Sequence, residues 1–139
     1  MQYKRKMGID FGEARIGIAF SDLLCMLATG RLTLTKTTDE EDIKTLIKLA
    51  KENDVDEIVF GLPLNMDGTE GERAKRTKDF GLALEKASKI KVSFEDERLS
   101  SYEAEEILKQ RKVKWQDRKK VLDQISAEII LQTYLNSHK

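Results

Sequence analysis

Hydrophobic and polar residues alternate along the first part of the chain, and this alternation predicts two neighbouring β-strands. Over residues 4–11, three large apolar side chains share one face, whereas Gly8 and Asp10 share the other. Over residues 15–21, the corresponding second face again carries small residues such as Gly17. Because only a short turn separates the two stretches, we expect an antiparallel hairpin. Its small-residue face would admit a helix at close range, and Asp10 lies on that face.

The pattern then changes between alternation, helical spacing and one unbroken apolar run. This run spans residues 57–62, is apolar from Ile58 onward, and is typical of a strand buried on both faces. In chain order, the further expected elements are a strand over residues 31–36, a helix over 39–53, this buried strand, a helix over 70–88, a strand over 91–95, and helices over 100–109 and 121–136.

This order of elements predicts an α/β fold. The first three strands should be antiparallel neighbours, and the last two strands, each reached through a helix, should run parallel to the first. We therefore expect a five-stranded mixed sheet, in which strands 1, 4 and 5 are parallel, with helices on both faces. No linker, repeat or low-complexity segment interrupts the 139 residues, so the sequence predicts a single domain over residues 1–139.

Composition limits the chemistry that this chain can perform. A single cysteine, Cys25, excludes an internal disulfide framework, and the lone His138 near the end leaves no Ser-His or Cys-His pair for catalysis. Catalysis would have to use carboxylates, basic side chains, hydroxyls or a hard metal ion held by oxygen. With 25 basic and 25 acidic residues the net charge is zero, so nucleic acid would have to bind local basic patches.

The sequence also indicates where the protein works. It contains no apolar run long enough to span a bilayer, so we expect no membrane partner. The first residues enter a strand without the apolar segment and small-residue cleavage site of a signal peptide. Together with the single cysteine, this pattern favours a cytoplasmic protein.

Acidic residues follow the ends of two strands of the expected sheet. Asp10 closes the first strand, and the strand over residues 91–95 runs directly into Asp96 and Glu97. Parallel strands present their carboxyl ends at one edge of the sheet, so these acids should meet there. Alternation puts Asp96 on the side opposite Glu97, and the sequence leaves open which of the two faces Asp10.

The last helix supplies a third carboxylate. Asp123 lies one turn before Ser126 and Ala127, two small residues that would let this helix pack closely on the Gly8 face of the hairpin. That packing would carry Asp123 toward Asp10, although an acid near a helix start is also favourable by itself. Three carboxylates would select Mg²⁺ or Mn²⁺, and two such ions can promote phosphodiester hydrolysis.

Basic residues near this edge are candidates for substrate binding. Arg73 and Arg76 lie three positions apart at the start of the helix over residues 70–88 and could face one phosphate backbone, or form an ordinary solvated helix face. Arg15 and Arg98 lie within five residues of a proposed acid. Each could hold the scissile phosphate or pair with an acid.

A basic connector precedes the last helix. Residues 109–120 include seven lysines and arginines with Trp115 among them. Cations beside an aromatic ring suit contact with a single nucleic-acid strand. Trp115 could instead anchor the connector to the core.

Several segments together resemble the bacterial YqgF family, also called RuvX or Holliday-junction-resolvase-like. They are GIDFG at residues 8–12, RIGIA at 15–19, SD at 21–22, GLPLNMDGTEG at 61–71, DERLS at 96–100 and DQISA at 123–127. The resemblance covers essentially the whole chain. It implies an RNase H-like fold, a nuclease role in maturing the 5′ end of 16S ribosomal RNA, and metal-binding acids at Asp10, Asp123 and either Glu97 or Asp96.

The chain departs from related resolvases at one informative place. Those proteins carry a glutamate on the fourth strand, whereas the corresponding strand here ends in Gly61, Leu62 and Pro63. The metal site would then have to be completed from the fifth strand.

The sequence leaves other functions open. The resemblance favours a ribosomal RNA precursor, with the pre-ribosomal particle as a partner. A DNA junction resolvase would need a symmetric dimer, and the sequence does not reveal the oligomeric state. A nucleic-acid-binding or ribosome assembly factor without catalysis is a different class. An ATP phosphate-binding turn around Asp10 would require a second domain for which this chain has no room.

Overall fold

The computed structural model describes residues 3–97 and 100–138, except for the side chains at positions 100–102 and 115. Its strands are β1 (Arg5–Phe11), β2 (Arg15–Ser21), β3 (Ala28–Thr35), β4 (Val55–Leu62) and β5 (Lys91–Asp96). Its helices are α1 (Asp39–Glu52), α2 (Glu72–Ser88), α3 (Ser100–Gln110) and α4 (Arg118–Ser137), with a 3₁₀ turn η1 (Trp115–Asp117) before α4. In the described part of the chain, no helix has the length and apolar character needed to cross a membrane.

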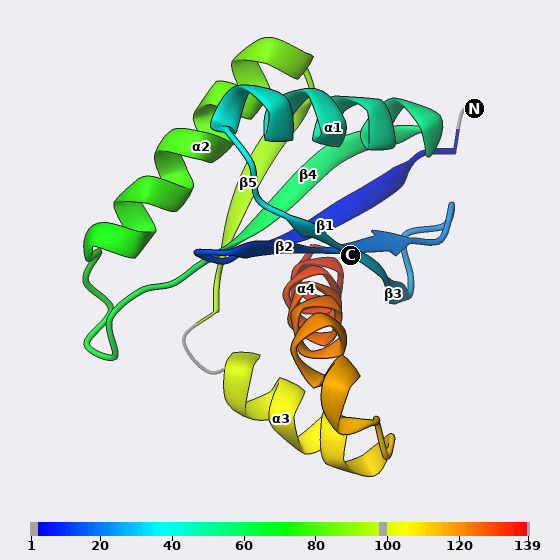
Figure 1. Ribbon diagram of the computed structural model, residues 1–139. Helices are drawn as coiled ribbons and strands as arrows, with labels where there is room; N and C mark the ends of the chain where they lie inside the picture. Colours follow the sequence, from blue (N-terminus) through cyan, green and yellow to red (C-terminus); the bar gives the residue numbers. More distant parts are fainter. Residues whose placement is uncertain (1–2, 98–99, 139) are drawn as a thin grey trace.

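The strands form one five-stranded sheet in the order β3-β2-β1-β4-β5. β1 pairs antiparallel with β2, and β2 pairs antiparallel with β3. β4 runs parallel to β1, and β5 runs parallel to β4. Helices α1 and α2 cover one face, α4 covers the other, and α3 packs beside α4 (Figure 1). The predicted mixed sheet with helices on both faces is confirmed.

The main core lies between the sheet and helices α1 and α2. Phe11 of β1 stacks on Phe80 of α2 with 4.3 Å between ring centroids, and Phe60 of β4 meets both rings edge-on. All three rings are at most 4% exposed. The alternation of β1 therefore sends Phe11 into this core and leaves Asp10, its neighbour, on the opposite face.

Small residues on that opposite face let α4 lie very close to the sheet. A Cβ atom on Gly8 would come within 2.7 Å of the Leu131 Cβ and 2.8 Å of the Ala127 carbonyl oxygen. Gly17 is in similar contact with the backbone of Asp123. The prediction that a helix covers the glycine face of the hairpin is confirmed.

Two elements begin earlier than their sequence pattern predicts. β3 begins at Ala28 rather than at position 31, because Ala28–Gly30 continue the pairing with β2 beyond a register shift, and side chains of α4 also accept hydrogen bonds from these residues. Gln132 accepts from the Ala28 amide at 2.8 Å, and Glu128 accepts from the Gly30 amide at 3.0 Å. α4 begins at Arg118 rather than at position 121, so the helix takes up the last part of the basic connector.

A buried ionic network stands at the amino end of the sheet, far along the strands from Asp10. Glu57 is 5% exposed, and its carboxylate accepts hydrogen bonds from the hydroxyls of Ser93 and Tyr134, each at 2.5 Å. Lys6 lies 3.3 Å away. Burial by itself would raise the pKa of Glu57, but the two hydroxyls and Lys6 lower it below its ordinary value.

Tyr134→Phe is expected to destabilise the protein by about 1–3 kcal/mol at pH 7, because a buried carboxylate loses one donor. Since the pKa of Glu57 is lower in the folded than in the unfolded chain, its ionised form stabilises the fold above the unfolded value and loses this effect as the pH falls. The difference in urea stability between wild type and variant should therefore shrink below about pH 4. Tyr3→Phe, at a ring that is 55% exposed, is the control. An equal loss at pH 7 and pH 3 would contradict the ionic network.

Candidate active site

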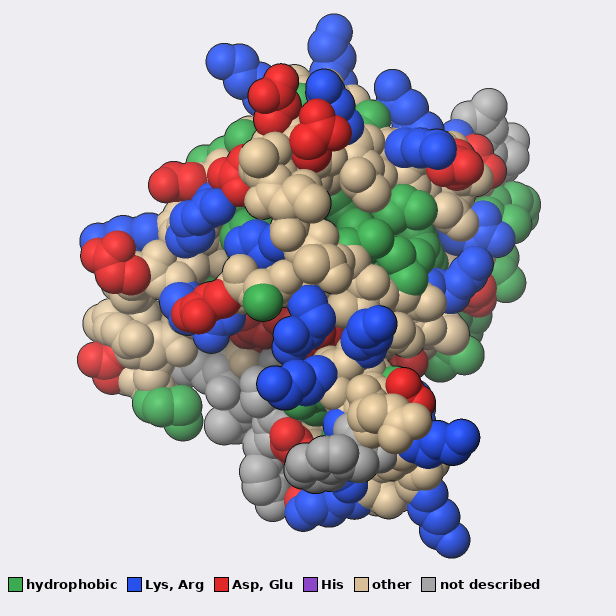
Figure 2. Space-filling model, in the orientation of Figure 1, with side chains coloured by type: hydrophobic (Ala, Val, Ile, Leu, Met, Phe, Trp, Pro, Cys, Tyr) green, Lys and Arg blue, Asp and Glu red, His purple; other side chains and the backbone are tan. Residues whose placement is uncertain are grey.

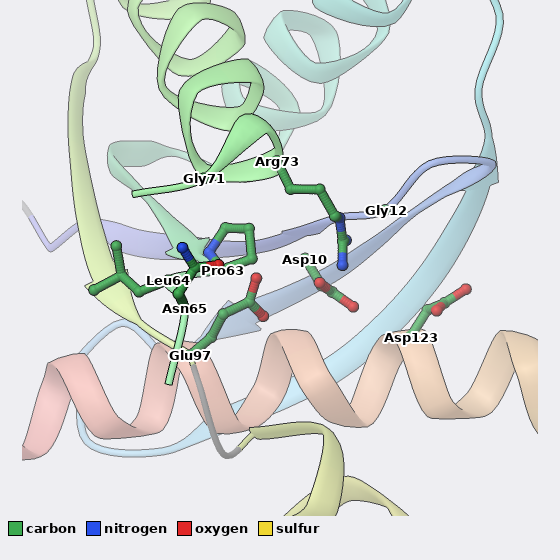
Figure 3. A pocket seen from close by; sticks show the side chains of 9 residues that line it. All are labelled: Asp10, Gly12, Pro63, Leu64, Asn65, Gly71, Arg73, Glu97 and Asp123. Atoms are coloured by element: carbon green, nitrogen blue, oxygen red, sulfur yellow. The ribbon is translucent and has the colours of Figure 1, made fainter. Parts of the chain in front are cut away.

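A pocket of about 440 Å³ opens at the carboxyl ends of β1 and β4 (Figure 3). Three acidic side chains line it, each from a different part of the chain. The lining residues are Asp10, Gly12, Pro63, Leu64, Asn65, Gly71, Arg73, Glu97 and Asp123. The structure thus brings together the end of β1, the residue after β5 and the first turns of α4, as the strand directions predict.

Asp10 lies between Glu97 and Asp123 in this pocket (Figure 3). Burial raises the pKa of Asp10 to about 6, and the negative charge of Asp123 contributes to the rise. The charge of Arg73 and a hydrogen bond with Glu97 act in the opposite direction. A carboxylate with so high a pKa exchanges its proton near neutral pH, which is a common property of functional acids.

Glu97, and not Asp96, is the acid after β5 that lines the pocket. Asp96 is paired with Leu62 at the edge of the sheet and is exposed. The Glu97 amide donates to the Leu62 carbonyl at 3.2 Å, which extends the strand pairing by one residue. Alternation left open which of these two adjacent acids faces Asp10, and in the structure it is Glu97 that lines the pocket with Asp10.

Gly61 on β4 makes room for Glu97. A Cβ atom at Gly61 would come within 2.3 Å of the Ile130 Cδ1 atom and 2.9 Å of the Glu97 carboxyl group. The acid from β5 thus occupies the space over the fourth strand, which here carries no acid of its own. That the acid after the fifth strand completes a metal site stays a prediction.

Asp123 is held by Arg15. The Arg15 Nε atom donates to the Asp123 carboxylate at 2.7 Å, and both side chains are partly buried. Arg15, a predicted substrate contact, thus forms an ion pair with one of the proposed metal ligands. Within residues 3–97 and 100–138, no three acidic, histidine or cysteine side chains lie close enough to enclose a metal ion. Asp123 would have to turn from Arg15 toward Asp10 to complete such a set.

Of the other predicted substrate residues, Arg73 lines the pocket and Arg76 does not. Arg73 extends from α2 toward Asp10 (Figure 3) and lies 4.0 Å from the exposed Glu13. Arg76 is outside this pocket and binds Asp39 at 2.7 Å. Arg98 lies outside the described residues, as does the side chain of Trp115. Figure 2 shows Lys and Arg side chains gathering near the middle of one face, interspersed with acidic ones.

The loop between β4 and α2 forms a wall of the pocket. The sequence places this loop at the expected active edge, and it belongs to a segment that resembles the family, but no site residue was predicted within positions 63–71. Asn65 holds this loop together: its backbone amide donates to the Thr69 carbonyl at 2.8 Å, and its side-chain amide donates to the Thr69 hydroxyl at 3.0 Å. Asp67 accepts from the Thr69 amide at 2.9 Å. The Asn-Met-Asp-Gly run is a turn signature, and its place after a strand's carboxyl end was the available signal.

Two solved structures show which fold class carries this site. Thermus thermophilus RuvC in complex with a Holliday junction substrate aligns with a TM-score of 0.57 over 97% of this chain and 95% of that chain, at 11% identity. The Fowlpox virus resolvase, in complex with Holliday junction DNA, gives a TM-score of 0.53 over 96% and 97%, at 10% identity. The chain therefore has an RNase H-like α/β fold, which it shares with these two solved structures.

Comparison of sequences finds relatives with much higher identity than these solved structures have. A family model described as "RuvX: Holliday junction resolvase" matches residues 4–137, and the chain belongs to this family. A protein of Syntrophomonas wolfei is 47% identical over 95% of this chain and 94% of its own length. A protein of Halothermothrix orenii is 46% identical with the same coverage, and both are named "Putative pre-16S rRNA nuclease".

Proposed function

We propose that this chain is a single-domain, metal-dependent nuclease that hydrolyses phosphodiester bonds in the precursor of 16S ribosomal RNA. The observation that carries the proposal is the meeting of Asp10, Glu97 and Asp123 in one pocket of a RuvC-like fold. The names of its relatives support the choice of substrate. A substrate of this kind would be met in the cytoplasm, within the pre-ribosomal particle.

The donor set fits Mg²⁺ or Mn²⁺, because all three side chains offer carboxylate oxygens. Asp10 and Glu97 are already hydrogen-bonded to each other, and both would be ligands of the ion once the shared proton has left. Asp123 would join them after leaving Arg15. When bound, one or two such ions supply an activated water and stabilise the leaving oxygen.

The remaining side chains have roles that follow from charge and position. Arg73 stands at the mouth of the pocket, where its guanidinium can bind a phosphate oxygen and orient the scissile bond. Arg15 would be left beside the same phosphate when Asp123 turns toward the metal. The loop over residues 63–71 contributes Pro63, Leu64, Asn65 and Gly71 to the lining of the pocket.

Metal affinity should depend on pH. Since the pKa of Asp10 is raised to about 6, a proton competes with the ion below that pH, and Asp10 is ionised above it. Calorimetric titration with Mn²⁺ should show full affinity at pH 7.5 and a loss approaching tenfold per pH unit below about pH 6. Asp96→Asn should keep this profile, because Asp96 is outside the pocket lining. The same Mn²⁺ affinity at pH 5 and pH 7 would contradict the proposed site.

A second function is favoured by the family description, which is that of a Holliday junction resolvase. The two functions separate when purified protein and Mg²⁺ are incubated with a 16S precursor transcript and with a four-way DNA junction. Cleavage near the 5′ end of the mature RNA, with the junction intact, supports the ribosomal function. Symmetric nicking of the junction alone would favour the resolvase, and binding without cleavage of either would favour an assembly factor.

A further inference from the structure

A second pocket adjoins the candidate active site. It has a volume of about 350 Å³ and shares Gly12 and Arg73 with the first pocket. Phe11, the residue after Asp10, lines it together with Lys36 and Arg76, and with the acids Glu13 and Glu72. The two pockets are therefore neighbours along one surface, with the Arg73 side chain between them.

Two of the cations lie over one aromatic ring. The Lys36 Nζ atom is 4.0 Å from the centroid of the Phe11 ring, and the Arg76 guanidinium carbon is 5.5 Å from it. Lys36 also donates to the Gly12 carbonyl at 3.2 Å. Burial and the positive charge of Arg76 lower the pKa of Lys36. An anion placed between the two cations would relieve their repulsion.

Three cations, Lys36, Arg73 and Arg76, and two acids, Glu13 and Glu72, line the second pocket. Arg76 is held by Asp39 at 2.7 Å, but both side chains are about half exposed. Glu13, which reaches Arg73 at 4.0 Å, is 85% exposed, and an exposed pair of this kind is easily separated. Within the part of the chain that the structure describes, Lys36 forms no ion pair. Lys36 is therefore the cation best placed to meet an incoming anion.

We propose that this second pocket binds a backbone phosphate of the nucleic-acid strand whose neighbouring phosphate occupies the candidate active site. Lys36 and Arg76 would contact its oxygens, and Arg73 would lie between the two phosphates. A strand offers phosphates at regular intervals, which suits two adjoining pockets that share an arginine better than a single free anion does. The inference rests on the proposed nuclease function for the identity of the polymer, whereas the anion site rests on the converging cations.

The test measures binding separately from cleavage. Fluorescence anisotropy would follow a labelled single-stranded RNA in the presence of EDTA over a range of KCl concentrations. Lys36→Met keeps an unbranched side chain over the Phe11 ring and removes the charge. We expect it to weaken binding by about threefold to tenfold at low salt and to reduce the slope of log K against log salt by about one.

Lys44→Met is the matched control, since Lys44 lies on α1 with a side chain that is 66% exposed and is absent from either pocket. It should bind RNA like the wild type. Wild-type affinity and salt slope in Lys36→Met, with circular dichroism showing a folded protein, would overturn the proposal. Absence of cleavage by the wild type would contradict the proposed function without changing this binding result.

The same assay distinguishes two sources of the phosphate. RNA with a 5′-phosphate and RNA with a 5′-hydroxyl are compared for wild type and Lys36→Met. If the pocket takes a terminal phosphate, the wild type prefers the phosphorylated strand and the variant loses that preference. If it takes an internal phosphate, the variant weakens binding of both strands equally. Both results support a phosphate site at Lys36.

Discussion

Asp10→Asn should reduce cleavage of a 16S precursor transcript by about a thousandfold or more, because it removes a charged oxygen ligand and keeps the shape of the side chain. The same change should not unfold the protein. Burial raises the pKa of Asp10 to about 6, so the folded state disfavours the ionised carboxylate at pH 7. The neutral amide should therefore raise the free energy of unfolding by about 1–3 kcal/mol. Activity and stability would change in opposite directions.

Asp96→Asn is the comparison that isolates the site. Asp96 carries the same carboxylate one residue before Glu97, but it is exposed and does not line the pocket. We expect this variant to keep most of the cleavage activity. Residual activity of Asp10→Asn near the wild-type level, measured with 10 mM Mg²⁺ at about pH 8, would show that the pocket is not the catalytic centre.

Gly17→Ala should be the most damaging of the single-methyl substitutions. The added Cβ would overlap the backbone of Asp123 on α4, and backbone atoms cannot rotate away as a side chain does. Overpacking of this kind costs about 1–3 kcal/mol or more, so we expect a lower midpoint in urea or thermal unfolding. The folded fraction of Gly17→Ala should also lose cleavage activity, because α4 would move away from the sheet and carry Asp123 with it.

Gly71→Ala provides the control for Gly17→Ala. The nearest atom to a Cβ at Gly71 is a side-chain oxygen of Asn65 at 3.2 Å, which can shift slightly. The change is expected to alter stability by less than about 1 kcal/mol. Equal destabilisation by the two substitutions would mean that helix α4 does not depend on the close approach at Gly17.

Local chemistry made much of the fold predictable. Alternation over β1 and β2 placed Asp10 on the face with Gly8 and Gly17, and the structure covers that face with α4. The direction of parallel strands brought the acid after β5 to the edge where Asp10 lies. These features could be predicted because they depend on the two-residue period of a strand and on the fixed handedness of strand connections. Both can be read from residues that are close together in the sequence.

Other features depended on partners far away in the chain. β3 starts early because Ala28–Gly30 pair with β2 beyond a register shift, and α4 side chains about 100 positions later bond to Ala28 and Gly30 as well. The choice of Glu97 over Asp96 depends on one further pairing with Leu62 and on the space above Gly61. No local pattern contains that information, because the register of β5 is set by the whole sheet.

The sequence by itself determined an α/β fold, the family, and the lack of a histidine or cysteine pair for catalysis, because these follow from residue identity and short-range periodicity. Only the tertiary structure decided that Glu97 faces Asp10, that Arg15 holds Asp123, and that Lys36 and Arg76 meet over Phe11. The physical reason is that such contacts join side chains from separate elements, and their geometry exists only after the sheet and α4 have packed together.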